Sequence, residues 1–200
     1  NIAYEIRLQQ AMEEDLLCPF HYFGITDLSL ISDEGRSKEE QLKNFRYLTS
    51  DERVKYVMEQ AAYFGYSGNR VKGLIFCSRI EEAQELSKKF NERGYKTLSL
   101  TGEDGQNQRE QAIERLVLDE GERKLDYIFT VDIFNEGIDI PKVNQVIMLR
   151  PTESAIVFVQ QLGRGLRKDP SKEYVVIIDF IGNYEKNFLI PIALSGSLSY

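Results

Sequence analysis

The chain has 200 residues, of which 42% are hydrophobic and 28% are charged, as expected for a globular domain with one core. No apolar run approaches the ~18 residues that a membrane span needs and no signal peptide is visible, so the sequence predicts a cytoplasmic protein without membrane contact. The net charge of −7 argues against general binding of polyanions.

Cysteine and histidine are too scarce to build a disulfide framework or a metal site. Cys18 and Cys77 are the two cysteines, and we expect both to be reduced core residues. His21 is the single histidine, so no histidine cluster is available for metal binding or for a catalytic triad. We therefore predict no metal ligands in the protein itself.

The first seventy residues differ in pattern from the rest. Residues 3–30 read as a helix or strand edge followed by extended chain, and residues 37–48 and 50–65 read as two helices with capping residues at Ser37 and Ser50. The chain starts with Asn rather than Met. We interpret this start as the cut end of a longer protein and residues 1–36 as an N-terminal connector.

From Val71 onward, short apolar runs alternate with segments of helical spacing. Apolar runs predict strands at 73–78, 96–100, 125–131, 143–149 and 173–181, and helical spacing predicts helices at 79–94, 106–118 and 154–167. Ser78 with Glu81 is a candidate N-terminal cap, and Gly94 is a candidate helix stop. This alternation indicates a three-layer α/β domain, with a mainly parallel central sheet flanked by helices, over residues 37–185; residues 186–200 would begin a downstream segment.

Positive charge is concentrated in one segment of this acidic chain. Between Lys142 and Lys172 there are six basic and two acidic residues, so this segment carries +4 and the remainder carries −11. A charged run is usually a solvated face, so this observation gains weight only together with the motifs inside the segment.

Polar residues follow several of the predicted strands. In open α/β sheets, ligands bind beyond the carboxyl ends of the strands. The residues at those positions are Ser78-Arg79, Thr101-Gly102, the segment 130–141 and Arg150-Pro151-Thr152. Gly, Thr, Ser and Arg are the residue types that hold phosphate groups.

The segment 130–141, "TVDIFNEGIDIP", contains a glycine and an aspartate suited to a nucleotide. Gly137 permits backbone conformations that other residues resist, and the carboxylate of Asp139 could accept hydrogen bonds from a ribose. An ordinary turn aspartate in a loop between strands is an equally good explanation from chemistry alone.

The stretch "QQLGRGLR" presents an amide, a glycine and two arginines on one helix face. Gln160, Gly163, Arg164 and Arg167 fall at positions i, i+3, i+4 and i+7. Guanidinium groups bind phosphate oxygens through two parallel hydrogen bonds. The alternative is a pair of surface arginines. Against it stand the glycines, which cost about 1 kcal/mol each inside a helix, and the apolar run "AIVFV" directly before the motif, which places the arginines at the edge of the domain.

These motifs together resemble superfamily 2 helicases. "QQLGRGLR" matches their motif VI, Q-x-x-G-R-x-x-R, "TVDIFNEGIDIP" resembles motif V, "GLIFCSR" resembles motif IV, and "SLTGED" resembles a loop that faces nucleic acid. The motifs stand in the family's order over roughly residues 71–180. The chain thus resembles the second RecA-like (helicase C-terminal) domain, and within it bacterial DEAD/DEAH helicases similar to the Res subunits of type III restriction enzymes.

The resemblance implies a role for each motif. ATP with Mg²⁺ would be held mainly by the missing first RecA-like domain, because this chain has no G-x-x-x-x-G-K-[ST] phosphate loop. Arg164 and Arg167 would reach the γ-phosphate, with Arg167 as the better candidate for the arginine finger, and Gln160 would couple ATP to motion. Contacts to the nucleotide would come from Gly137, Asp139 and Gly163, and contacts to the nucleic-acid backbone from Ser78, Arg79, Thr101 and Thr130. The resemblance suggests no role for Glu136.

The expected function is therefore the second motor domain of an ATP-dependent nucleic-acid helicase or translocase, inactive by itself. Its partners would be DNA, with RNA as an alternative, and the first RecA-like domain of the same polypeptide. A second reading is a non-catalytic helicase-like scaffold or partner-binding module, although a scaffold has no use for the Gln160 face. A stand-alone binder of small nucleotides is a third reading, which the missing phosphate loop disfavours.

Overall fold

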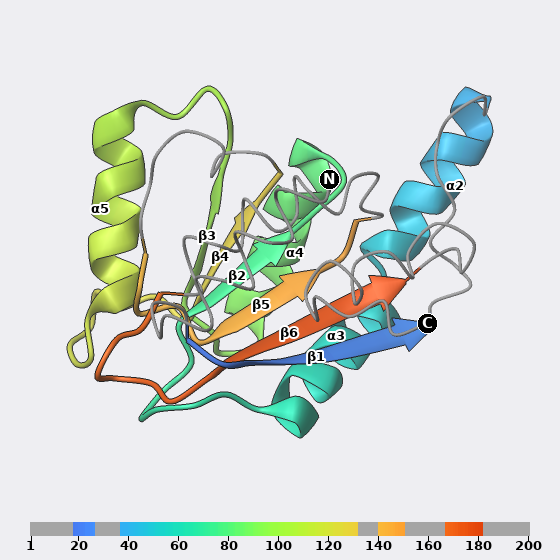
Figure 1. The fold of residues 1–200 in the computed structure, drawn as a ribbon. Coiled ribbons are helices and arrows are strands. Elements are labelled where there is room, and N and C mark those ends of the chain that lie inside the picture. Colours follow the sequence, from blue (N-terminus) through green and yellow to red (C-terminus); the bar gives the residue numbers. More distant parts are fainter. Residues whose placement is uncertain (1–17, 27–36, 132–139, 151–166, 182–200) are drawn as a thin grey trace, which may run out of the picture.

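A computed structural model describes residues 18–26, 37–131, 140–150 and 167–181 of the chain. Six parallel strands form one sheet in the order β1-β6-β5-β2-β4-β3, flanked by helices (Figure 1). The strands are β1 (Phe20–Thr26), β2 (Gly73–Phe76), β3 (Thr97–Leu100), β4 (Tyr127–Thr130), β5 (Gln145–Met148) and β6 (Val175–Ile181). The helices are α2 (Lys38–Leu48), α3 (Asp51–Phe64), α4 (Ile80–Glu92) and α5 (Gln106–Val117).

The sheet is covered on both faces, which explains why its central strands are apolar throughout. Successive side chains of a strand point to opposite faces. Leu74 and Phe76 accordingly join the core under α5, whereas Ile75 and Cys77 join the core under α3 and α4. Figure 1 shows α5 on one side of the sheet and α3 and α4 on the other. The predicted three-layer α/β fold with a mainly parallel sheet is confirmed.

Several predicted helix boundaries are also confirmed. Ser50 caps α3, because its hydroxyl accepts a hydrogen bond from the Arg53 amide at 3.2 Å. Gly94 follows α4 with φ +90°, a left-handed conformation that favours glycine and ends the helix. The helix predicted at 154–167 lies outside the described residues except for Arg167.

The segment expected to be extended chain near the N-terminus contributes the edge strand β1. It pairs in parallel with β6, with Phe20 opposite Val175. The Tyr22 hydroxyl donates a hydrogen bond of 2.5 Å to the Asp179 carboxylate. Burial raises the pKa of Asp179 to about 6 in spite of this bond. The strand thus joins the sheet through backbone pairing and through a polar contact.

Register aligns the carboxyl ends of three neighbouring strands. Phe76 of β2 lies opposite Thr130 of β4, and Thr130 lies opposite Leu100 of β3. The residues that directly follow these strands therefore emerge at one edge of the sheet.

Both cysteines are buried and free. None of the helices in the described part of the chain is long and apolar enough to cross a membrane.

Candidate nucleic-acid interface

The edge formed by β2, β4 and β3 gathers four residues that the sequence predicts to contact nucleic acid. Ser78 and Arg79 follow β2, Thr101 follows β3, and Thr130 ends β4. Since these strands are neighbours in the sheet, residues spread over more than fifty positions of sequence meet at one edge. The structure thus brings these predicted site residues together, and the side chains differ in how accessible they are.

The loop after β2 presents a hydroxyl and a guanidinium group. Ser78 is exposed, and Arg79 is partly exposed with an extended backbone (φ −148°, ψ 160°) at the start of α4. The guanidinium carbon of Arg79 lies 5.9 Å from the centre of the Phe45 ring, which belongs to α2. This cation–π contact holds the cation beside the loop.

Beneath this loop lies Glu82, a buried carboxylate that the sequence analysis did not select. Glu82 is 1% exposed, and its Oε2 accepts a hydrogen bond of 2.9 Å from the Ser78 amide. Burial raises the pKa of Glu82 to about 7, although the bonds from the Ser78 and Arg79 amides and the nearby positive charge of Arg53 oppose the rise. The carboxylate therefore fixes the backbone of the loop from below.

The predicted cap of α4 is wrong by one residue. Arg79, not Ser78, is the N-cap residue, and its side chain makes no capping bond. The acidic residue that reaches back to the loop amides is Glu82 rather than Glu81. A glutamate three residues after the N-cap is the position that can return to the preceding backbone, so the signal was present once the true start of the helix is known.

Charge around Glu82 is balanced by a second buried side chain, Arg53 of α3. Arg53 is 3% exposed, and its guanidinium carbon lies 4.9 Å from the centre of the Phe180 ring. Burial lowers the pKa of Arg53 to about 10, which leaves it charged at neutral pH. Glu82 favours that charge. The β2–α4 loop thus lies above two buried ionisable side chains, Glu82 and Arg53, and the charged form of each favours the charged form of the other.

The loop after β3 is a tight turn closed by Asp104. The Thr101 amide donates a hydrogen bond of 2.6 Å to Asp104 Oδ2, and the Asp104 amide donates one of 3.2 Å to the Thr101 carbonyl. The Thr101 hydroxyl accepts a bond of 3.3 Å from the Glu103 amide and remains partly exposed. The turn therefore holds Thr101 at the edge without covering it.

Thr130 lies at the same edge but is 0% exposed. Its carbonyl accepts a hydrogen bond of 2.8 Å from the Cys77 amide, which ties the ends of β4 and β2 together. In this structure Thr130 supports the loop after β2 from within the sheet. The predicted contact between its hydroxyl and nucleic acid stays a prediction.

The residues predicted to face ATP cannot be placed in the same way. Gly137, Asp139, Gln160, Gly163 and Arg164 all lie outside the described residues. Arg167 is described and exposed. Their predicted roles toward ATP and Mg²⁺ stay predictions.

The chain next to Arg167 lies at the amino ends of the strands, opposite to the carboxyl ends where Ser78 and Thr101 lie. Asp169 forms an isolated bridge with Lys172, and Lys172 Nζ donates a hydrogen bond of 2.7 Å to the Val143 carbonyl, just before β5. Within a few residues of Arg167 the chain has thus reached the amino ends of the strands. Arg167 is therefore not grouped with Ser78 and Thr101.

Known proteins resemble this chain in sequence and in fold. It is 27% identical over 184 residues, or 91% of its length, to the Saccharomyces cerevisiae protein named "Putative ATP-dependent helicase IRC3". It is 28% identical over 78% of its length to the ATP-dependent RNA helicase SrmB of Haemophilus influenzae. The structure of the ATP-dependent type ISP restriction-modification enzyme LlaBIII bound to DNA matches 94% of the chain with a TM-score of 0.61 at 20% identity, which shows a shared fold.

The match to a protein family covers more than half of the chain. The chain spans 26% of the yeast relative, 34% of SrmB and 14% of the LlaBIII chain. The helicase conserved C-terminal domain matches residues 52–169, which include the β2, β3 and β4 edge. The chain therefore belongs to the helicase conserved C-terminal domain family, the second RecA-like domain of superfamily 2 helicases.

Proposed function

We propose that this chain is the second motor domain of an ATP-dependent nucleic-acid helicase or translocase. The observation that carries the proposal is the edge where Ser78, Arg79 and Thr101 meet, with each loop fixed by a carboxylate and with polar side chains reaching solvent. A phosphate-contacting surface needs donors that are held in place before the strand arrives, because ordering them on binding would cost affinity.

The edge is suited to a nucleic-acid backbone rather than to a particular base sequence. Ser78 and Thr101 offer hydroxyl groups, and Arg79 offers a guanidinium group, and all three groups bind phosphate oxygens. Contacts to phosphate and sugar fix the register of a strand but carry no sequence information. A motor that moves along a strand requires this kind of contact. Thr130 lies under the edge and is the fourth residue predicted to contact the nucleic-acid backbone.

Chemistry would take place where this domain meets the first RecA-like domain. Arg164 and Arg167 would stabilise the charge that develops on the γ-phosphate, and Gln160 would transmit the state of the nucleotide. Gly137, Asp139 and Gly163 would approach the nucleotide itself. ATP and its Mg²⁺ would be held mainly by the first domain, so this chain alone would not hydrolyse ATP.

Relatives point to both kinds of nucleic acid. SrmB is named as an RNA helicase, and LlaBIII is a restriction-modification enzyme bound to DNA. The hydroxyl and guanidinium donors at the edge serve either backbone. We propose DNA as the partner, with RNA as the alternative, and a helicase role within a longer polypeptide.

The test is ATPase turnover in the full-length protein that contains this chain. Arg167→Ala should lower strand-stimulated turnover by a factor on the order of 10³ and leave ATP affinity within a few-fold, because an arginine finger acts mainly in the transition state. Lys168→Ala removes a neighbouring exposed charge and should leave turnover nearly unchanged. Full turnover in Arg167→Ala would show that the arginine finger is wrongly assigned.

Loss of turnover in Arg167→Ala must be separated from loss of folding. The variant should therefore show the same thermal unfolding midpoint as the wild type. The isolated 200-residue chain should show no strand-stimulated ATPase activity. Turnover by the isolated chain would contradict the proposed dependence on the first domain.

A further inference from the structure

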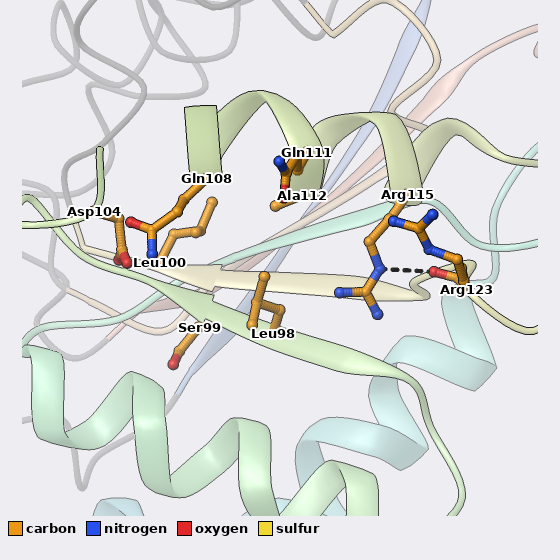
Figure 2. Close-up of a pocket in the computed structure, with 9 residues that line it drawn as sticks. All are labelled: Leu98, Ser99, Leu100, Asp104, Gln108, Gln111, Ala112, Arg115 and Arg123. Carbon is orange, nitrogen blue, oxygen red and sulfur yellow. Dashed lines mark hydrogen bonds between the residues drawn. The ribbon is translucent and has the colours of Figure 1, made fainter. Parts of the chain in front are cut away.

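A polar hollow lies between the edge strand β3 and helix α5, beside the Thr101 turn. Its volume is about 270 Å³, and Figure 2 shows it running along the inner face of α5. It is lined by Leu98, Ser99, Leu100, Asp104, Gln108, Gln111, Ala112, Arg115 and Arg123. At this size it fits a group about as large as a single nucleotide, near the lower end of the range for ligand pockets.

The two ends of the hollow differ in chemistry. Asp104 and Gln108 lie at one end, next to the Thr101 turn, and Arg115 and Arg123 lie at the other end (Figure 2). The carboxylate of Asp104 already accepts the Thr101 amide at 2.6 Å. The arginine end is therefore the part of the hollow that can attract an anion.

Neither arginine of the hollow forms a salt bridge with a described residue. Arg115 Nε donates a hydrogen bond of 2.9 Å to the Arg123 carbonyl, which fixes the direction of the Arg115 guanidinium group. The neighbouring Glu122 carboxylate pairs instead with Lys96 Nζ at 3.1 Å. Two guanidinium groups line one hollow without a carboxylate between them, in a chain whose net charge is −7. Two positive charges at one place repel each other, and an anion that binds between them offsets this repulsion.

The open edge of β3 adds backbone groups to the same hollow. The Thr97 amide donates to Asn91 Oδ1 at 2.7 Å and the Thr97 carbonyl accepts from Asn91 Nδ2 at 3.2 Å, so the outer edge of β3 is closed at its start. The Asp104 turn closes it at Thr101. Because alternate residues face the same edge, the Ser99 backbone faces outward between these two caps, where Ser99 lines the hollow.

We propose that this hollow, the β3–α5 groove, binds a phosphate group of the nucleic-acid strand after the strand has passed the Thr101 turn. The inference rests on the proposed function. Arg115 and Arg123 would bind the phosphate, and Gln108, Gln111 and the Ser99 backbone would contact the adjoining sugar or base. The groove would thus extend the path of the strand from the carboxyl edge along the side of the domain.

Distance and continuity favour a strand over a separate ligand. The axis of α5 from Gln106 to Arg115 spans about 14 Å, at about 1.5 Å per residue, so the arginines lie a few nucleotides beyond the Thr101 turn. One end of the groove is formed by Asp104, which also closes that turn. A strand held at Thr101 needs no break in its path to reach Arg115.

The test compares oligonucleotides of two lengths on the full-length protein. In fluorescence anisotropy, Arg115→Ala/Arg123→Ala should weaken binding of a single strand of about 16 nucleotides roughly tenfold and leave binding of about 6 nucleotides unchanged. The slope of log affinity against log salt should fall by about 0.7, which is the contribution of one phosphate contact on a single strand. Lys88→Ala removes an exposed charge from α4, on the other face of the sheet, and should leave the affinity for both oligonucleotides unchanged.

A second variant guards against a folding defect. Gln111→Glu changes one exposed residue of the groove into an anion and leaves both arginines in place. It should weaken binding of the longer strand only. Equal thermal unfolding midpoints for both variants and wild type would show that the losses come from the groove.

Several results would contradict strand binding by the groove without contradicting the proposed function. One is an equal effect of Arg115→Ala/Arg123→Ala on both lengths, or no effect on either, while Arg79→Ala weakens both. Another is that free AMP or polyglutamate competes for the groove equally with strands of both lengths. That result would assign the groove to a free nucleotide or to an acidic peptide. Failure of Arg79→Ala to weaken any strand would instead count against the proposed function.

Discussion

The two ends of the strands use polar side chains in different ways. At the amino ends, Asn144 is 2% exposed and makes three hydrogen bonds: its Oδ1 accepts from the Lys72 amide at 2.8 Å, and its Nδ2 donates to the carbonyls of Ser67 at 2.7 Å and Arg70 at 2.8 Å. At the carboxyl ends, Ser78 reaches solvent while only its backbone is tied down. Buried polar groups at one edge join the elements, and exposed polar groups at the other edge remain available.

Further contacts extend the network at the amino ends. Gln145 is 0% exposed, and its Nε2 donates to the carbonyls of Ala61 at 2.9 Å and Gly65 at 2.8 Å, at the end of α3. The Arg70 guanidinium group donates to backbone carbonyls of residues Leu116, Leu118, Leu125 and Val71. These bonds close the ends of helices on both faces of the sheet.

The two ends of the strands should respond differently to substitution. A side chain that satisfies several buried backbone groups has little freedom to bind a ligand, and its loss leaves those groups without partners. A side chain that reaches solvent over a fixed backbone costs little to remove and can contact a strand. Variants that break this buried amino-end network should therefore change stability, and variants of the exposed side chains at the carboxyl ends should change binding.

Removal of the Asn144 side chain should lower stability the most. Asn144→Ala leaves the Lys72 amide and the carbonyls of Ser67 and Arg70 without their partner, so the free energy of unfolding should fall by about 3 to 5 kcal/mol. Urea unfolding followed by circular dichroism measures the change. Asn69→Ala, at an exposed asparagine in the loop that contains Ser67 and Arg70, should cost less than about 0.5 kcal/mol.

Two outcomes would contradict this role of Asn144. A loss below about 1 kcal/mol in Asn144→Ala would mean that the amino-end network adds little to stability. Weaker strand binding by Asn144→Ala under conditions where it is folded, with unchanged binding by Asn69→Ala, would mean that the Asn144 network also takes part in binding.

A smaller change in stability is expected at Glu82, a buried residue at the carboxyl ends. The folded-state pKa of about 7 lies above the ordinary value of 4.5, so its contribution to stability is present at low pH and is lost as the pH rises through 7. Between pH 4.5 and pH 8 this amounts to about 3 kcal/mol. In Glu82→Gln, that part of the pH dependence should disappear.

Urea unfolding at several pH values measures the difference between Glu82→Gln and wild type. The pKa of Asp179 is also raised, and its contribution is common to both proteins, so it cancels in the comparison. Glu81→Gln is the matched control, because Glu81 is exposed and adjacent in sequence. Parallel pH curves for Glu82→Gln and wild type would show that the carboxylate is not held as the structure places it.

Much of the fold could be predicted from the sequence because its signals are local. Alternating apolar runs and helical spacing predict the five strands after Val71 and the helices between them, and Ser50 and Gly94 mark helix ends directly. Strand ends then indicate which residues share an edge. This is why the sequence alone indicates Ser78 and Thr101.

The rest could not be predicted because it depends on contacts between distant residues. Gln145 and the Ala61 carbonyl are 84 positions apart, and nothing local marks them as partners. The order of the strands makes β3 an edge strand, and only that order opens the groove containing Arg115 and Arg123. The capping error at Ser78 is instead local, because a helix that begins one residue later exchanges Glu81 for Glu82.

The smallest expected change in free energy is at Arg79, and it tests the carboxyl ends directly. Arg79→Ala should weaken single-strand binding about tenfold at low salt, which is about 1.4 kcal/mol, and should lower stability by less than about 1 kcal/mol through loss of the Phe45 contact. Anisotropy titrations over a range of salt concentrations measure the first change, with Lys88→Ala as control. Because Glu82 holds the loop through its backbone amides, the Ser78 hydroxyl should stay in place in this variant, so binding should weaken without being abolished. Large destabilisation with unchanged affinity would reverse the roles assigned to the two ends of the sheet.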